Sequence, residues 1–348
     1  MSSAVLQQLT ILSGLTTCVA LLVTLLRAPL RGLLGARAAY WLWVTVPASA
    51  IALVLPSVSR SSGAAAPLAP HAFSWLGARL DALLAAIQGS GPWAAAILVV
   101  WTMGVTAAGV FMILRQRAFM SSLGRLVRSA DGTWRSRGVA EPMLIGALRP
   151  RVLLPLDFEQ RYCPEEREFV LAHERAHMRR GDTTVSAFAA AWLCVFWFNP
   201  VMFWAIRLLR FDQDLACDAA VLAAAGRSRR GRYAGALLKA QLAGQAALPV
   251  PLACHWRSVH PLRRRIAALE RPVAGRMRHG IGILCAAALV ASVSLVAHAV
   301  QPAVHAAPPI AATTAASAAR APAAHASAKV CPLSRRHAPA RHQGPSRA

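Results

Sequence analysis

Four long apolar stretches without a charged residue constrain the fold of this chain more than any other feature. A helix needs about 20 apolar residues to cross about 30 Å of hydrocarbon. The stretches of roughly this length are Ala4–Leu26, Ala38–Leu55, Trp93–Leu114 and Gly280–Val300. The second is the shortest and contains Pro47, which a helix interior disfavours. Together with a composition that is 56% hydrophobic, they predict a mainly α-helical membrane protein with four spans.

The basic residues predict how the chain crosses the membrane. Of the 38 Lys and Arg residues, three lie in the short segment 27–37 and 27 lie in residues 115–279. Because basic residues concentrate in cytoplasmic segments, we expect both segments in the cytoplasm. The N-terminus, residues 56–92 and the C-terminal tail then lie outside the cytoplasmic (inner) membrane. The first stretch has no basic segment before it and no clear cleavage site, which indicates an anchor and not a signal peptide.

The same pattern divides the chain into four parts. Residues 1–114 contain three spans, residues 115–279 are long enough for a folded cytoplasmic domain, and residues 280–300 form the fourth span. Residues 301–348 form an extracytoplasmic tail. The tail is rich in Ala and Pro and has almost no large apolar side chains, so we expect it to be disordered.

The net charge of +24 raises the question of a nucleic-acid partner. The basic residues follow the alternation of the predicted spans, and 13 of the 14 acidic residues lie beside most of them in residues 115–279. Membrane topology and contact with the anionic lipids of the bilayer therefore explain the positive charge. We expect the lipid bilayer, and no direct nucleic acid, as the partner of the basic surface.

Three features of the cytoplasmic part predict its local structure. In residues 141–155 ("EPMLIGALRPRVLLP"), short apolar runs separated by Pro and Gly predict extended strands, and a helical pattern starts at Glu165. The segment Val185–Ile206 is uncharged and long enough to cross a membrane, but Asn199-Pro200 interrupts it. We favour a buried or membrane-dipping helix over a fifth span.

A His-Glu-x-x-His motif lies in this helical segment, within "FVLAHERAHMRRGD" (residues 169–182). Residues four apart lie on one face of a helix, so His173 and His177 can present two imidazoles to one tetrahedral zinc ion. Glu174 would point towards the open side of that ion. There it can take a proton from the attacking water and later pass it to the leaving amine. The motif alone also occurs in unrelated chains.

A zinc site needs a further protein ligand, and "FDQDLACDAAVL" (residues 211–222) offers two carboxylates. Asp214 and Asp218 are four residues apart on one predicted helix face. One of them can complete a His/His/carboxylate site, and the other can orient a ligand imidazole. The alternative is that both only cap the helix or form ion pairs with Arg207 or Arg210.

These motifs resemble the BlaR/MecR-type membrane metallopeptidases, the antirepressor family. The resemblance lies in "LAHERAHMRRGD", in "WFNP" at 197–200, in "DLACDAAVL" at 214–222 and in the strand region 142–155; with the spans it covers roughly residues 1–300. It implies a four-span protein with a cytoplasmic gluzincin-like α+β zinc peptidase domain between the third and fourth spans. Members of the family respond to an outside signal and bring about the loss of a winged-helix repressor, often with cleavage of themselves.

The resemblance also implies roles for single residues. By position in the family's motifs, His173 and His177 are zinc ligands and Glu174 is the catalytic base. Asp214 occupies the place of the family's glutamate ligand, and Asp218 matches an aspartate that supports a ligand.

The chain departs from the family's pattern in two places. Asp214 is one methylene shorter than glutamate, so either the two helices approach more closely or the ligation is weaker. Cys217 lies three residues away and is an alternative ligand, although such a cysteine is more often a small core residue. The best-known members carry an outer penicillin-binding domain with a Ser-x-x-Lys nucleophile. The residues three positions before Lys239 and Lys329 are alanines, so we expect no β-lactam sensing by acylation.

Three functional hypotheses remain. The first is a membrane zinc endopeptidase that cleaves a cytoplasmic winged-helix repressor-like protein and, in some settings, itself. The second is a signalling scaffold that keeps the fold with weak or no catalysis, and the third is an adaptor that reaches the periplasm through its tail. We favour the first because His173, Glu174 and His177 are all present. The sequence fixes neither the signal nor the oligomeric state, and a homodimer stays open.

Overall fold

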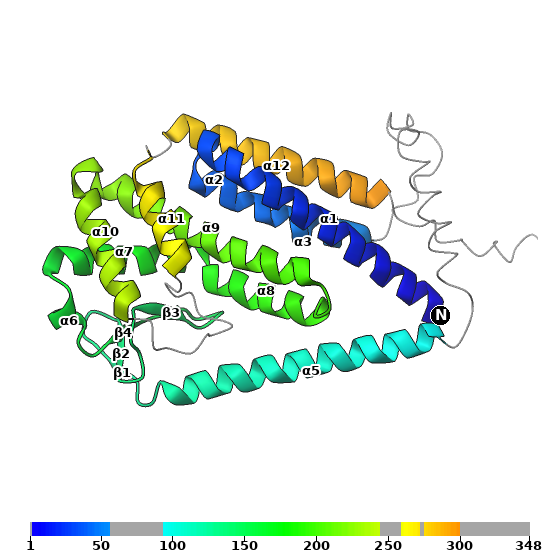
Figure 1. The fold of residues 1–348 in the computed structure, drawn as a ribbon, viewed down its shortest axis with the longest axis horizontal. Helices are drawn as coiled ribbons and strands as arrows, with labels where there is room; N and C mark the ends of the chain where they lie inside the picture. Colours follow the sequence, from blue (N-terminus) through cyan, green and yellow to red (C-terminus); the bar gives the residue numbers. More distant parts are fainter. Residues whose placement is uncertain (1, 56–92, 244–258, 272–274, 300–348) are drawn as a thin grey trace, which may run out of the picture. The chain divides into compact units, whose positions relative to one another are not determined.

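The apolar stretches form long helices, as Figure 1 shows for the computed structural model. The residues that the structure describes are 2–55, 93–243, 259–271 and 275–299. They all lie within one structural unit, Met1–Gln301. The outer loop expected at residues 56–92 and the disordered tail expected at residues 301–348 fall outside the described residues.

Four helical segments among the described residues are long and apolar enough to cross a membrane. These segments are Ala4–Leu34, Ala36–Val54, Trp93–Ser122 and Arg276–His298. They correspond to α1 (Ser2–Leu34), α2 with α3 (Ala36–Trp41 and Thr45–Val54), α5 (Trp93–Ser122) and α12 (Arg276–Ala299). The expectation of a mainly α-helical fold with four apolar helices of spanning length is confirmed.

The segment between α5 and α12 contains a small sheet and six further α-helices within the described residues. The helices are α6 (Phe158–Arg161), α7 (Pro164–Arg180), α8 (Asp182–Val195), α9 (Pro200–Ala225), α10 (Arg230–Ala243) and α11 (Val259–Leu269). The structure also contains two 3-10 turns: η1 (Leu42–Val44) lies between α2 and α3, and η2 (Arg227–Arg229) lies between α9 and α10. This arrangement places the His-Glu-x-x-His motif in α7 and both candidate carboxylates in α9.

The first helix is longer than its apolar stretch. It was expected to end before Arg27, but α1 continues to Leu34. The Nη1 atoms of Arg27 and Arg31 lie 3.0 and 3.2 Å from Oδ1 of Asp212 in α9, and Trp43 Nε1 donates a hydrogen bond of 2.9 Å to Oδ2. These contacts offset the cost of burying the charges of Arg27 and Arg31 against α9. The two arginines, expected in a connecting segment, therefore belong to α1.

The second apolar stretch is helical but not continuous. A 3-10 turn, η1, separates α2 from α3. Pro47 is the third residue of α3, in the first turn, where its missing N–H leaves no helix hydrogen bond unmade. Gly35, with φ of 94°, separates α2 from the end of α1.

The strands expected in residues 141–155 are confirmed as β3 (Met143–Ile145) and β4 (Arg151–Pro155). With β1 (Val127–Arg128) and β2 (Trp134–Ser136) they form a sheet of order β1-β2-β4-β3, in which β2 and β4 are parallel and the other pairs antiparallel. Gly146 makes the turn after β3 with φ of 92°, and a Cβ atom there would lie 2.5 Å from the Arg149 carbonyl. Because β3 comes last in the strand order, it is an edge strand, and it packs against α7.

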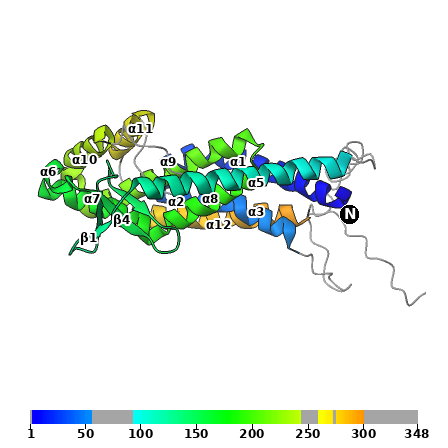
Figure 2. The ribbon, with the colours of Figure 1, turned by 90° about the horizontal axis from the view of Figure 1, so that it is seen from below.

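The predicted break at Asn199-Pro200 separates α8 from α9. The Asn199 side chain accepts a hydrogen bond from Val201 N at 3.0 Å and donates one of 2.7 Å to Thr17 Oγ1 in α1. α8 has 14 residues, about 21 Å of helix, which is shorter than the hydrocarbon core. α8 and α9 pack against each other and run side by side in Figures 1 and 2. The segment 185–206 thus forms part of a helical hairpin.

Two of the apolar cores meet along α9. The first joins α1, α2, α3 and α12 to α8 and α9 and includes Val19, Tyr40, Ala189, Met202 and Ala286. The second joins the sheet to α6, α7, α10 and α11 and includes Leu144, Phe158, Phe169, Tyr233 and Leu262. The first half of α9 contributes to the former and its end to the latter. The helix that carries both candidate carboxylates therefore connects the long apolar helices to the helix of the motif.

Candidate metal centre

α7 presents the His-Glu-x-x-His motif because the local sequence fixes both of its ends. Pro164 occupies the first turn, and the Glu166 carboxylate accepts a hydrogen bond of 3.0 Å from Cys163 N. Gly181 ends the helix in the left-handed conformation, with φ of 70°. The helical pattern expected from Glu165 through the motif is confirmed.

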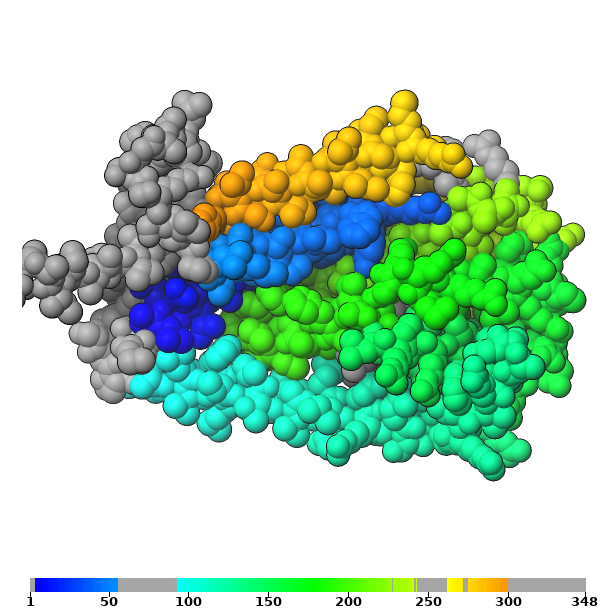
Figure 3. All heavy atoms as spheres, turned by 180° about the vertical axis from the view of Figure 1, so that it is seen from behind, coloured from blue at the N-terminus to red at the C-terminus, as the bar shows by residue number. Residues whose placement is uncertain are grey.

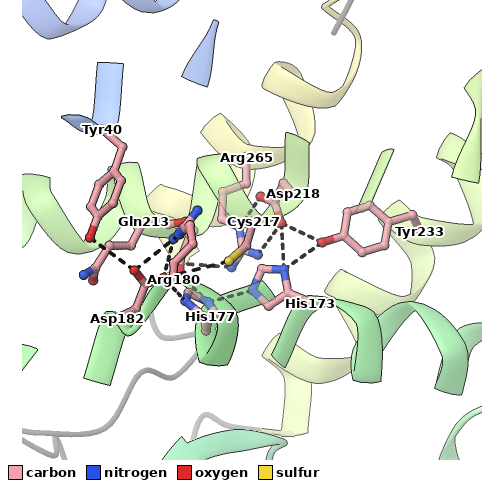
Figure 4. A network of polar contacts seen from close by, with 11 residues as sticks. Tyr40, His173, His177, Arg180, Asp182, Gln213, Cys217, Asp218, Tyr233 and Arg265 are labelled. Atoms are coloured by element: carbon pink, nitrogen blue, oxygen red, sulfur yellow. Dashed lines mark hydrogen bonds and ion pairs between the residues drawn. The ribbon is translucent and has the colours of Figure 1, made fainter. Parts of the chain in front are cut away.

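The two histidines of the motif converge through their Nε2 atoms, which lie 3.0 Å apart (Figure 4). His173 is 0% and His177 2% exposed. Tetrahedral coordination with bonds of about 2.0–2.1 Å would place two ligand nitrogens roughly 3.3–3.4 Å apart. The observed separation is close to that spacing. Glu174, the next residue in α7, is also buried.

Asp214 approaches the same side of the histidine pair from α9. Its Oδ1 lies 3.5 Å from His177 Nε2, and its Oδ2 lies 3.5 Å from Nη1 of Arg265. The side chain of Asp214 is 17% exposed, whereas those of both histidines are almost fully buried. Asp214 therefore lies on the more open side of the cluster.

Asp218 lies on the other side of His173. Its Oδ1 is 3.2 Å from His173 Nδ1, and Tyr233 Oη, 2.9 Å from the same nitrogen, donates a hydrogen bond of 2.6 Å to Oδ1. Arg265 donates one hydrogen bond of 2.8 Å to each oxygen of Asp218. In the tautomer that leaves Nε2 free for a metal, the protonated Nδ1 of His173 donates to the oxygens of Tyr233 and Asp218. Asp218 and Tyr233 thus fix the orientation of the imidazole.

A second carboxylate supports His177 in the same way. Asp182 Oδ2 lies 2.7 Å from His177 Nδ1. Asp182 also accepts hydrogen bonds from Tyr40 Oη, at 3.1 Å, and from Arg180 Nε, at 3.3 Å. Arg180 in turn donates to the Gln213 carbonyl at 2.8 Å. Because Tyr40 belongs to α2, one of the apolar helices directly contacts Asp182, the residue that supports His177 (Figure 4).

Cys217 is a second candidate for the third ligand. One ligand atom of each of His173, His177 and Cys217 lies within 4.8 Å of the other two. However, the sulfur lies 4.0 Å from Asp182 Oδ2, the oxygen that contacts His177 Nδ1. Burial also raises the pKa of the Cys217 thiol. Asp214 contacts His177 Nε2 instead, so the geometry favours Asp214 when the histidines bind through Nε2.

Burial and neighbouring charges shift the pKa values of His173, Asp218 and Asp214. Burial lowers the pKa of His173 to about 3, so its imidazole is neutral, which is the form that binds metals. Burial alone would raise the pKa of Asp218, but the charge and hydrogen bonds of Arg265, together with the hydrogen bond of His173, outweigh burial and hold that pKa below its usual range. Burial raises the pKa of Asp214. Asp218, the carboxylate that supports His173, is therefore ionised. A cation beside Asp214 would stabilise the ionised form of that candidate ligand.

The sequence did not predict most of the supporting residues. Tyr233 and Arg265 come from α10 and α11 and carry no motif that marks them. Asp182 had a weak signal, since it lies five residues after the second histidine of the motif. Both candidate carboxylates form ion pairs with Arg265.

The donor set fits a zinc ion. The two imidazole Nε2 atoms lie at ligand spacing, an oxygen of Asp214 lies 3.5 Å from one of them, and a carboxylate contacts Nδ1 of each imidazole. His173 and His177 would hold the ion with Asp214. A His-Glu-x-x-His helix that meets a carboxylate from a second helix defines the metallopeptidase class of site.

Comparisons with known proteins identify the family. The sequence profile described as BlaR1 peptidase M56 matches residues 8–269, and the chain belongs to this family. Regulatory protein BlaR1 of Bacillus licheniformis is 30% identical over 105 residues, which are 30% of this chain and 17% of that protein. The methicillin resistance mecR1 proteins of Staphylococcus aureus and Staphylococcus epidermidis are 25% identical over 107 residues, 31% of this chain and 18% of theirs. The aligned segments thus span less than a fifth of these relatives, and the resemblance seen in the sequence is confirmed.

Proposed function

We propose that this chain is a membrane zinc endopeptidase of the antirepressor type. It cleaves a cytoplasmic winged-helix repressor-like protein, and in some settings itself, in response to a signal from outside the cell. The observation that carries the proposal is the convergence of His173, His177 and Asp214 from α7 and α9. The membership of the BlaR1 peptidase family and the four apolar helices agree with it.

The residues of the site divide the chemistry between them. A zinc ion held by His173, His177 and Asp214 would supply a Lewis acid that makes a water molecule more acidic and polarises the peptide carbonyl. Glu174 accepts the proton of the attacking water and passes it to the leaving amine. Asp218 and the other support residues hold the imidazoles with Nε2 turned towards the site.

The sheet offers a place for an extended substrate. β3 is one of the two edge strands of the sheet and packs against α7; its three residues are buried, and no described strand pairs with its outer edge. A substrate that adds a strand here would bind through backbone hydrogen bonds, which require little sequence selection. We propose Met143–Ile145 as this binding edge. A flexible segment of a repressor, or of the chain itself, could bind in this way.

The test of the proposed function begins with the reading frames that neighbour this one. A small winged-helix protein encoded there should be cleaved when it is produced together with the full chain, and a zinc chelator should prevent the cleavage. Immunoblotting of both proteins measures the fragments. If the repressor stays intact while the chain retains zinc and its fold, the scaffold hypothesis replaces this one.

We propose the orientation that the arginines predict. The N-terminus and the tail are outside the cytoplasmic membrane, and the peptidase residues between α5 and α12 are in the cytoplasm. The basic residues at the end of α1 and the start of α12 support this orientation.

Reporter fusions test the orientation. A reporter that is active only outside the cytoplasm should work when it is fused near Ser62 or Ala316, and should be inactive near Gly138 or Gly231. A cytoplasmic reporter at the same positions should give the opposite pattern. Activity of the extracytoplasmic reporter at Gly231 would contradict a cytoplasmic peptidase.

A further inference from the structure

An apolar cavity of about 560 Å³ lies between α2–α3 and α8–α9. Figure 3 shows the face on which these elements meet, with α3 in blue beside the green of α8 and α9. The walls of the cavity are mainly large apolar side chains, including Trp43, Val46, Phe188, Trp192, Met202 and Ile206. The volume is within the range of about 300–1,000 Å³ that is typical of small-molecule sites.

One end of this cavity is basic. Arg179 and Arg180, at the end of α7, line it there. A second cavity, of about 550 Å³, shares both arginines and adds Arg37 and His279 to its lining. No acidic residue lines either cavity in the part of the chain that the structure describes. The two cavities share Tyr40, Trp41, Arg179 and Arg180 and are therefore adjacent, one mainly apolar and the other cationic.

Two of the arginines are available to a ligand. Arg180 contacts Asp182 and the Gln213 carbonyl, so its guanidinium is already engaged. Arg37 and Arg179, in contrast, form no ion pair with any described residue. Arg179 is exposed and Arg37 is half-buried. Unpaired cations at the mouth of an apolar cavity favour a ligand that has both an anionic group and an apolar chain.

The position along the helices points to a lipid. Arg37 is the second residue of the candidate span Ala36–Val54, and His279 lies near the start of the candidate span Arg276–His298. The cationic part therefore lies at the ends of these spans, and the apolar part extends along them. Trp41, which lines both cavities, lies at this boundary, as tryptophans of membrane proteins commonly do. Basic pockets between helices at this level bind anionic lipid headgroups.

We propose that the two cavities form a binding site for an anionic phospholipid. The phosphate binds between Arg37 and Arg179, and an acyl chain fills the apolar cavity between α2–α3 and α8–α9. A zwitterionic lipid fits less well, because the described lining residues include no carboxylate to receive its ammonium group. Free phosphate would leave the apolar cavity unfilled.

The test measures lipid binding by the full chain, purified in detergent and stripped of lipid. Native mass spectrometry counts bound phosphatidylglycerol and, in parallel, phosphatidylcholine with the same acyl chains. Phosphatidylglycerol should bind more tightly, and Arg37→Gln and Arg179→Gln should each weaken it by roughly fivefold. Arg117→Gln is the matched control, because Arg117 is an exposed arginine near the end of another candidate span and lines neither cavity. It should leave the affinity unchanged.

Two further arms separate a lipid from a soluble anion. Ala205 lines the apolar cavity, so Ala205→Phe should weaken phosphatidylglycerol binding by filling the space of the acyl chain. Circular dichroism shows whether this variant folds; if it does not, the arginine variants decide alone. Inorganic phosphate should not displace the lipid. Equal affinity for the two lipids, unchanged affinity in both arginine variants, or displacement by inorganic phosphate would overturn the proposal.

Discussion

Replacing Glu174 with glutamine is expected to abolish cleavage while leaving the metal bound. Glutamine has nearly the shape of glutamate but cannot accept the proton of the attacking water. Loss of a general base typically lowers the rate by roughly 10²–10⁴-fold. The metal should stay, because the ligand atoms come from His173, His177 and Asp214 and not from Glu174. Fragment yield on immunoblots and zinc content by elemental mass spectrometry measure the two quantities.

The matched variant for Glu174→Gln is His173→Ala, which should lose both zinc and cleavage. Arg175→Gln, at the next position of α7, is an exposed control and should change neither. Undiminished cleavage by Glu174→Gln, with fragments that disappear in chelator, would place the catalytic base elsewhere. Loss of zinc from the same variant would show that Glu174 takes part in binding the metal.

The motif helix could be predicted from the sequence because its determinants are local. The spacing of His173 and His177 alone places both on one face of a helix, and Pro164 and Gly181 mark its ends. The break before α9 was equally readable, since Asn199-Pro200 both interrupts one helix and starts the next. Structural features that depend on a few neighbouring residues can be predicted from the sequence.

The support of the histidines could not be predicted because it depends on distant pairs. Tyr233 contacts His173 across 60 positions, and Tyr40 contacts Asp182 across 142. Single tyrosines carry no periodic signal, and their pairing is decided by how α2, α8 and α10 pack around α7. The same reason explains the unexpected length of α1, whose arginines reach Asp212 more than 180 positions away.

These distant contacts give the fold a physical connection between its long apolar helices and the metal centre. Asp212, which α1 holds through two arginines, lies two residues before Asp214 in α9. Tyr40 of α2 holds Asp182, which holds His177. α1 therefore contacts a neighbour of a candidate ligand, and α2 contacts the support of His177. This connection is consistent with the proposed response to a signal from outside the cell.

Replacing Asp214 with alanine is expected to remove zinc and cleavage together. The Oδ1 atom of Asp214 lies 3.5 Å from His177 Nε2, and alanine would leave the two histidines as the protein ligands. Asp218→Ala should be milder, with a loss of roughly 10–100-fold in metal affinity, because Asp218 acts through His173. Zinc titration of the purified variants measures both affinities.

Two further variants decide which residue is the third ligand. Asp214→Glu extends the carboxylate by about one bond length, ~1.5 Å, and should retain zinc, since the side chain lies on the more open side of the cluster and can adjust. Cys217→Ala should also retain zinc, because the sulfur lies near Asp182 Oδ2, on the Nδ1 side of His177. The opposite pattern, with zinc retained in Asp214→Ala and lost in Cys217→Ala, would make the thiolate the ligand. Asp214 would then serve only as the ion-pair partner of Arg265.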